Sequence, residues 1–295
     1  MSGEHEAPRR AEDVGEAVEK LAGMERHVSL SSGDTRYFET GTGDPVLLLH
    51  GVGFTAGGSN WLFNMEDLGS AHRVIAPDFL GFGTGGRLEQ PYSFAYLVDF
   101  VREFQDALGL DASDVVGHSM GGWVAALLAY ESPGRVRRLV LIAAGGLSSR
   151  VPAMMRWSEM PARDTFAAGV AERLGLPVDA VGALADLEWQ SAVVPGAVDA
   201  YGRLLAHMGD PETRRRYHLR RRLPRIGAET LVLWGEHDQV NEVSLAREMV
   251  HLVPRARLEL FGCGHAVPTT APRETNRALC RFLDRPGAGR GAGAS

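Results

Sequence analysis

The sequence predicts an α/β protein with a mostly parallel sheet of eight strands, helices on both faces, and one helical insertion. Short apolar runs end at Gly or Pro, which is typical of strands that are buried on both faces of a parallel sheet. Segments with apolar residues at a spacing near 3.6 lie between several of these runs, and this strand–helix alternation indicates an α/β fold. The alternation stops between residues 147 and 223, where the pattern is helical throughout.

The elements can be assigned in chain order. Residues 1–24 form a polar N-terminal segment in which Ala11–Met24 has helical spacing, and His27–Ser31 and Thr35–Thr40 indicate an antiparallel hairpin. Six apolar runs predict further strands: Val46–Leu49, Val74–Ala76, Val115–Val116, Leu139–Ala144, Leu231–Trp234 and Leu258–Phe261. Three segments have clear helical spacing: Ser93–Leu108, Met120–Tyr130 and Leu245–Leu252. This order predicts a core of residues 25–146 and 224–285, a helical lid of residues 147–223, and a flexible tail of residues 286–295.

The composition excludes several classes of protein. A net charge of −6 argues against a nucleic-acid-binding role, because gripping phosphate backbones needs a basic surface. Two cysteines cannot build a disulfide framework, and no apolar run is long enough for a membrane span. Residues 1–26 are polar and charged where a signal peptide would need an apolar stretch. We therefore expect a cytoplasmic protein that does not bind membranes and takes a small-molecule substrate; formation of a homodimer stays open.

Ser119 is the candidate nucleophile. It lies in Gly117-His118-Ser119-Met120-Gly121, which matches G-x-S-x-G. The bare pattern is weak in a glycine-rich chain, but here it follows a predicted strand and opens a predicted helix. That context is the one in which a tight turn exposes a serine hydroxyl above a parallel sheet.

His265 and Asp238 are the candidates for the base and for the acid that orients it. A serine hydroxyl needs a base to take its proton. His265 follows the last predicted strand in a glycine-rich loop, at the sheet edge where α/β proteins carry out chemistry. Asp238 follows the preceding strand and would fix the imidazole tautomer, with Glu236 as the alternative.

Two backbone amides are expected to hold the oxyanion. One belongs to Met120, the residue after the nucleophile. The other belongs to the glycine-rich loop after the third predicted strand, where we assign it to Val52. No cofactor is needed for this chemistry.

These motifs together resemble the α/β-hydrolase family over roughly residues 25–285. Within that family the chain is most similar to the meta-cleavage-product hydrolases, which split C–C bonds in 2-hydroxy-6-oxo-dienoates. Leu258–His265 and Asn60-Trp61 support this branch. The resemblance implies a Ser-Asp-His triad, in that chain order, beneath a helical lid.

The chain departs from that branch at positions that read the substrate. His118 stands where the branch usually has Asn, and Ala266 stands where it usually has Trp. Glu188, before Trp189, aligns with a lid arginine of the branch. A carboxylate there would repel an anionic dienoate, although Arg156 or Arg163 could substitute for the missing cation. With Trp157 of the lid, these residues are the predicted substrate contacts.

We therefore expect a serine hydrolase that cleaves an ester, lactone or related acyl bond of a mid-sized apolar substrate, and that turns over simple esters better than dienoates. A dienoate-type C–C hydrolase is the first alternative. The second is a non-hydrolytic, cofactor-free oxygenase, cyclase or binding protein on the same scaffold. The basic run formed by Arg214–Arg216 and Arg220–Arg222 is interpreted as a solvated helix face, with binding of an anionic substrate or partner as the alternative.

Overall fold

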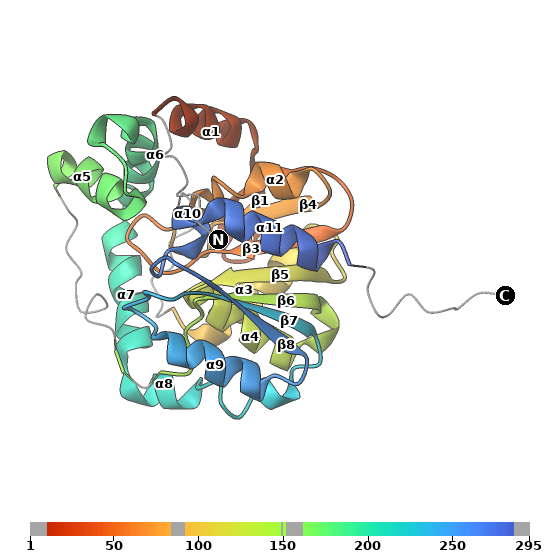
Figure 1. Ribbon diagram of the computed structural model, residues 1–295. Coiled ribbons are helices and arrows are strands. Elements are labelled where there is room, and N and C mark those ends of the chain that lie inside the picture. Colours follow the sequence, from red (N-terminus) through yellow and green to blue (C-terminus); the bar gives the residue numbers. More distant parts are fainter. Residues whose placement is uncertain (1–10, 84–91, 149, 152–161, 286–295) are drawn as a thin grey trace.

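The computed structural model describes residues 11–83, 92–148, 150–151 and 162–285, and its centre is one eight-stranded sheet. The strands are β1 (Glu25–Leu30), β2 (Gly33–Thr40), β3 (Pro45–Leu49), β4 (Arg73–Pro77), β5 (Ser113–His118), β6 (Val136–Ile142), β7 (Glu229–Gly235) and β8 (Ala256–Phe261). Their spatial order is β1-β2-β4-β3-β5-β6-β7-β8. β2 pairs antiparallel with both β1 and β4, and all other pairs are parallel (Figure 1). The predicted fold class is confirmed.

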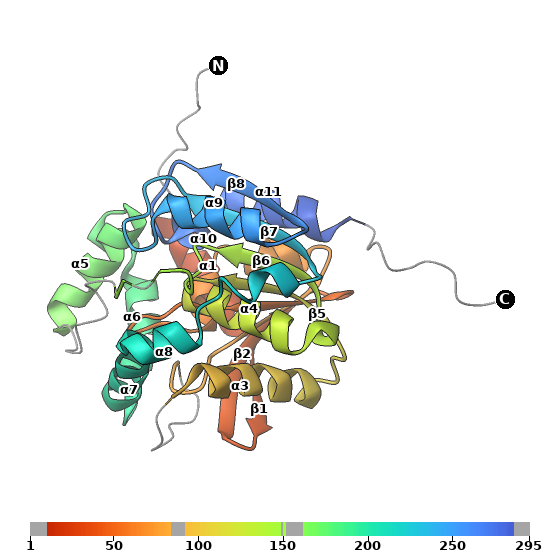
Figure 2. The same cartoon turned by 90° about the horizontal axis from the view of Figure 1, so that it is seen from below.

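Helices pack on the sheet, and further helices follow one another in the described part of the chain between β6 and β7 (Figures 1 and 2). The described helices outside the predicted lid segment are α1 (Ala11–Gly23), α2 (Met65–Gly69), α3 (Phe94–Ala107), α4 (Met120–Glu131), α9 (Val243–Leu252), α10 (Val267–Thr270) and α11 (Pro272–Leu283). Short 3₁₀ turns are η1 (Gly58–Trp61), η2 (Pro133–Arg135) and η5 (Leu223–Arg225). The predicted lid segment contains α5 (Arg163–Leu174), η4 (Val178–Ala180), α6 (Gly182–Ala192), α7 (Ala197–Gly209) and α8 (Pro211–Arg216). Among its described residues there is no strand, as its helical pattern predicts.

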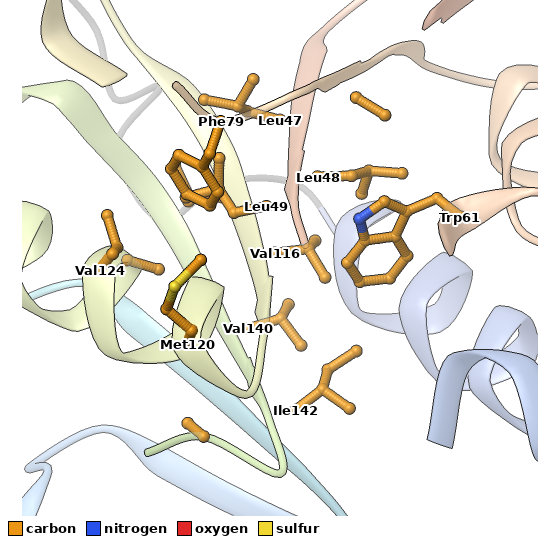
Figure 3. Packing of buried hydrophobic residues seen from close by; sticks show 14 of the residues in the cluster. Leu47, Leu48, Leu49, Trp61, Phe79, Val116, Met120, Val124, Val140 and Ile142 are labelled. Atoms are coloured by element: carbon orange, nitrogen blue, oxygen red, sulfur yellow. The ribbon is translucent and has the colours of Figure 1, made fainter. Parts of the chain in front are cut away.

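Apolar side chains on both faces of the central strands explain why the sheet is buried. β3, β5 and β6 carry continuous apolar runs whose members are fully buried. Figure 3 shows Met120 and Val124 of α4 on one side of these strands and Trp61 on the other. Burying such side chains on two faces removes apolar surface from water at roughly 25 cal/mol per Å².

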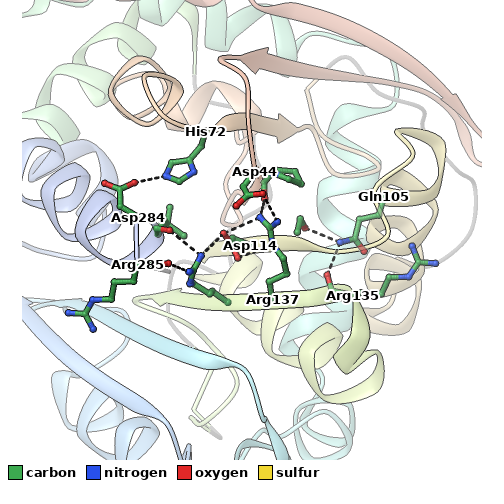
Figure 4. A network of polar contacts seen from close by, with 12 residues as sticks. Asp44, His72, Gln105, Asp114, Arg135, Arg137, Asp284 and Arg285 are labelled. Atoms are coloured by element: carbon green, nitrogen blue, oxygen red, sulfur yellow. Dashed lines mark hydrogen bonds and ion pairs between the residues drawn. The ribbon is translucent and has the colours of Figure 1, made fainter. Parts of the chain in front are cut away.

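A network of ion pairs lies at the amino ends of the central strands (Figure 4). The Asp114 carboxylate, fully buried in β5, accepts from Arg137 Nη2 at 3.2 Å and from Arg138 Nη1 at 3.3 Å. Arg137 also pairs with Asp44 at 3.1 Å. Burial raises the pKa of the Asp114 carboxyl, and the two arginines oppose that shift. This network lies at the amino ends of the strands, opposite to the carboxyl ends that carry the candidate site residues.

Candidate active site

Ser119 lies at a strained turn between β5 and α4. Its backbone has φ 54° and ψ −111°, a region that costs a non-glycine residue about 1–3 kcal/mol. The Ser119 N–H donates to the Ile142 carbonyl at 2.9 Å, which ties the turn to β6. Surrounding structure therefore holds the side chain out from the end of β5, as the sequence motif predicts.

The glycines of the motif allow the backbones at this turn to approach closely. A Cβ at Gly117 would lie 2.3 Å from the Gly121 carbonyl oxygen, and a Cβ at Gly121 would lie 2.2 Å from the Leu49 carbonyl oxygen. Real Cβ atoms do not approach backbone so closely, so any larger residue would push α4 away from β3 and β5. G-x-S-x-G is thus a packing requirement in this chain.

The three predicted side chains form one hydrogen-bonded series. His265 Nε2 lies 2.9 Å from Ser119 Oγ, and His265 Nδ1 lies 2.8 Å from Asp238 Oδ2. Because the carboxylate can only accept, Nδ1 carries the proton and Nε2 is left to accept from the serine hydroxyl. Asp238 makes the contact with His265, and Glu236 does not.

The loops after β7 and β8 place Asp238 and His265 side by side. Asp238 Oδ1 accepts from the backbone N–H groups of Val240 and Asn241 at 2.8 and 2.9 Å, which leaves Oδ2 for the imidazole. A Cβ at Gly235 would lie 2.2 Å from the Gly264 carbonyl oxygen, so only glycine lets the two loops meet. Gly235 before Asp238 and Gly264 before His265 are the local sequence signal that these two loops lie close together.

Val52 and Met120, the predicted oxyanion donors, both lie beside Ser119. Met120 is the first residue of α4, and a helix leaves its first N–H groups without an intrahelical acceptor. Val52 lies in the loop after β3, and both residues line a cavity beside Ser119. Buried His50 holds this loop: its Nε2 accepts from the Phe79 N–H at 2.9 Å, and its Nδ1–H donates to the Gly51 carbonyl at 2.7 Å. Burial lowers the pKa of His50 to about 4, so the ring stays neutral.

His118 contacts the catalytic loop as well as the cavity. Its Nε2–H donates to the backbone carbonyl of His265 at 2.9 Å, and the two rings lie 5.1 Å apart. Burial, with a smaller contribution from His265, lowers the pKa of His118 to about 3. His118 is therefore a neutral donor that ties the β5 end to the loop carrying His265.

Two cavities meet at the triad. The larger has a volume of about 350 Å³ and is lined mainly by apolar residues of the loop after β3 and of α10, together with His118, His265, Ala266 and Arg173. The smaller, of about 20 Å³, is lined by Ser119, Met120, Trp123, Arg214 and Asn241 among others. Val52, Val240 and His265 line both cavities. A substrate carbonyl at Ser119 would thus have space on two sides.

The structure brings some of the predicted substrate contacts to these cavities and places others elsewhere. His118 and Ala266 line the larger cavity. Trp189 packs instead against Phe166, with ring centroids 5.3 Å apart, and lines neither cavity. Trp157 lies outside the described residues.

Glu188 lies behind the larger cavity, where its charge is paired. The residue is 3% exposed; one carboxylate oxygen accepts from Thr55 Oγ1 at 3.0 Å, and the other accepts from Arg173 Nη2 at 2.5 Å. Arg173 itself lines the cavity. The expected repulsion by a bare Glu188 carboxylate is therefore wrong, because Arg173, which lines the cavity, neutralises that carboxylate.

Sequence reasoning missed Arg173 and misread part of the arginine-rich run. Arg163, named as a substitute cation, pairs with Asp186 at the surface, and Arg156 lies outside the described residues. The run 214–222 was predicted to be solvated, but Arg214 and Arg222 are 4% and 8% exposed. That prediction is wrong for these two residues, because Arg214 packs on the Trp123 ring and Arg222 on the Tyr130 ring.

Comparisons with known proteins agree with this fold. The model of the alpha/beta hydrolase family matches residues 46–278, and the chain belongs to that family. A 2-hydroxymuconate semialdehyde hydrolase of Pseudomonas sp. strain CF600 is 32% identical over 248 residues, which cover 78% of this chain and 83% of that protein.

Two solved structures extend this likeness. A meta-cleavage product hydrolase from Pseudomonas fluorescens IP01 superposes with a TM-score of 0.78 at 27% identity, covering 89% of this chain and 98% of that one. A membrane phospholipase A superposes with a TM-score of 0.74 at 28% identity, covering 93% and 90%. The chain is therefore a member of an enzyme family and is similar to hydrolases of more than one kind.

The helices of the described residues include none with the length and apolar character of a membrane span.

Proposed function

We propose that this protein is a serine hydrolase that cleaves an ester, lactone or related acyl bond of a mid-sized substrate. The observation that carries the proposal is the series Ser119–His265–Asp238, with contacts of 2.9 and 2.8 Å. The apolar cavity of about 350 Å³ beside it suits a mid-sized apolar group.

Each residue has one role in the proposed reaction. Ser119 Oγ attacks the substrate carbonyl while His265 Nε2 accepts its proton. The amides of Val52 and Met120 donate to the oxygen that becomes negative, and Asp238 stabilises the imidazolium. His265 then protonates the leaving group, and water releases the acyl group from Ser119 by the same steps in reverse.

A labelling experiment tests the nucleophile. A fluorophosphonate probe should label the wild-type protein and should not label Ser119→Ala, because only an activated serine attacks phosphorus readily. Asp238→Asn should lower kcat for an ester by about 10⁴, since the imidazole loses its productive tautomer. Glu236→Gln is the matched control and should keep nearly full activity. Equal labelling of wild type and Ser119→Ala would contradict the proposal, and absence of labelling in both would favour the non-hydrolytic alternative.

C–C bond hydrolysis of a dienoate is the second candidate, and Arg173 favours it. The relatives include proteins named as hydrolases of such compounds, and Arg173 puts a cation at the wall of the larger cavity. A cation within about 4 Å of a substrate carboxylate contributes about 1–4 kcal/mol, depending on screening.

A substrate panel separates the two candidates. We expect p-nitrophenyl butyrate to have the higher kcat/KM when compared with a phenyl-substituted 2-hydroxy-6-oxo-dienoate on one preparation. If the dienoate is preferred by more than tenfold, the second candidate replaces the first. In that case Arg173→Gln should lower dienoate turnover about 5- to 1000-fold, which is the interaction energy of about 1–4 kcal/mol expressed as a rate ratio. Ester turnover should stay nearly unchanged.

A further inference from the structure

Arg214 is a buried cation beside the nucleophile. The residue is 4% exposed and lines the same small cavity as Ser119, Met120 and Trp123. Its Nη1 donates to the Met208 carbonyl at 3.0 Å and its Nη2 donates to the Ser148 carbonyl at 2.8 Å. Its buried Nε has no hydrogen-bond partner among the described residues. The guanidinium is thus only partly satisfied by the protein.

The charge of Arg214 also lacks a counter-ion. Among the described residues no carboxylate forms an ion pair with it, whereas buried Arg36 and Arg138 each pair with a buried aspartate. Buried Arg222 also lacks an ion pair among the described residues, but it does not line the small cavity. Burial lowers the pKa of the Arg214 guanidinium, and no nearby charge opposes that shift. An arginine nevertheless stays protonated, and a buried charge without a partner is costly unless something else compensates it.

The two neighbouring arginines show that this burial is specific to one position. Arg215 and Arg216 lie on the exposed side of α8, and Arg215 pairs with Glu212 at 3.5 Å across the surface. Arg214 alone of the three turns toward the cavity, with its guanidinium carbon 5.4 Å from the Trp123 ring centroid. A purely structural role, linking the end of α7 to the chain after β6, would use the two carbonyl contacts but would not need a charge at the cavity wall.

The size of the cavity limits what can meet this charge. Its volume of about 20 Å³ has room for one or two water-sized groups. Because Ser119 and Arg214 both line so small a space, a group held by the guanidinium must lie close to the carbonyl that Ser119 attacks. The larger cavity, on the side of His265 and Ala266, then has the space for the rest of the substrate.

We propose that Arg214 binds a carboxylate on the short acyl side of the substrate, so that the natural substrate is a half-ester of a short dicarboxylic acid. This inference rests on the proposed function and names its substrate class. Arg214 anchors the free carboxylate in the small cavity, and the apolar alcohol part occupies the larger cavity.

Water is the second reactant that hydrolysis of this half-ester needs. The Ser119 Oγ–carbonyl bond forms as the ester C–O bond breaks, and His265 passes the serine proton to the departing alkoxide. Water then attacks the acyl-enzyme and releases the dicarboxylate. The carboxylate at Arg214 is unchanged throughout, so it contributes orientation and affinity only.

The test compares two esters that differ only in charge. Monophenyl malonate and phenyl 3-methylbutanoate share the leaving group, and the carboxylate of the first has the shape of the isopropyl group of the second. We expect the wild-type protein to prefer the malonate at least tenfold in kcat/KM. Arg214→Gln should reduce this preference at least tenfold, and Arg214→Lys should restore part of it. Arg215→Gln, the adjacent exposed arginine, is the matched control and should leave the preference unchanged.

The outcomes separate this inference from the proposed function. If the wild-type protein prefers the neutral ester, the inference is overturned. This result needs no variant, so it holds even if Arg214→Gln fails to fold. Loss of the preference in Arg173→Gln but not in Arg214→Gln would also overturn it, because the carboxylate would then occupy the larger cavity. If neither ester is hydrolysed, calorimetric titration of Ser119→Ala with both esters decides: tighter binding of the malonate supports the role of Arg214, and equal or weaker binding rejects it. Fluorophosphonate labelling of Ser119 reports on the proposed function separately.

Discussion

At the residue scale, His50 and His118 lie near Ser119 without serving as bases; His50 is fully buried, and His118 is partly buried at the wall of the larger cavity. His50 holds the loop that carries Val52, and His118 holds the loop that carries His265. The pKa values of both are lowered, to about 4 and about 3, chiefly by burial. Both rings therefore act as fixed donors and acceptors, and only His265 is placed to exchange a proton with Ser119.

This arrangement predicts acid sensitivity of the fold. Below about pH 6.5 the unfolded chain protonates His118 but the folded chain does not, so stability is lost as the pH falls from about 6.5 toward 3. For a shift of this size the loss between pH 7 and pH 5 is about 2 kcal/mol. His118→Asn, which retains a donor, should reduce the difference between urea midpoints at these two pH values. His251→Asn, at an exposed histidine of α9, is the control and should not change it; equal pH dependence of wild type and His118→Asn would contradict the prediction.

At the element scale, several contacts attach the helices between β6 and β7 to the core. Thr55 and Phe54, in the loop after β3, contact Glu188 of α6 and Tyr201 of α7. The N-terminal helix α1 packs against α6 and η4, and its Lys20 pairs with Glu66 of α2 at 2.9 Å (Figure 1). α1 therefore bridges the insertion and the core, a position that its polar composition alone does not predict.

The bridging position of α1 predicts a large effect from one apolar side chain. Leu21 is 1% exposed, so Leu21→Ala should lower the free energy of unfolding by about 2–5 kcal/mol through lost burial and the cavity left behind. Urea unfolding measures this change, and faster proteolysis of the insertion would accompany it if α1 secures those helices. Glu19→Ala, on the exposed side of the same helix, should leave both unchanged. A Leu21→Ala variant with wild-type stability would show that α1 contributes little to the fold.

At the scale of the whole molecule, the two edges of the sheet have different tasks. The amino ends of the strands are closed by paired charges around Asp114 (Figure 4). The carboxyl ends hold Ser119, Asp238 and His265 on three separate loops, as is usual for parallel sheets. Close contacts at glycines hold these loops against the sheet, so the core positions the candidate site. The insertion contributes Arg173 and Arg214 to the cavity walls.

The sequence by itself determined the parts that depend on local pattern. Strands closed by glycine, the G-x-S-x-G turn, and the order of Ser119, Asp238 and His265 all follow from short-range rules, and the structure places these residues together. The choice of Asp238 over Glu236 was also predicted, but it rests physically on the loop contacts that aim one carboxylate at the imidazole.

Only the tertiary structure decided which side chains of the insertion line the two cavities. Arg173 and Glu188 are 15 residues apart, and their pairing neutralises the carboxylate that the sequence predicts at the cavity. Three successive arginines look equivalent in the sequence, yet packing of α8 buries Arg214 and leaves the next two exposed. A helix presents each residue in a different direction, and the partner surface that selects one direction is formed by elements far away in the chain.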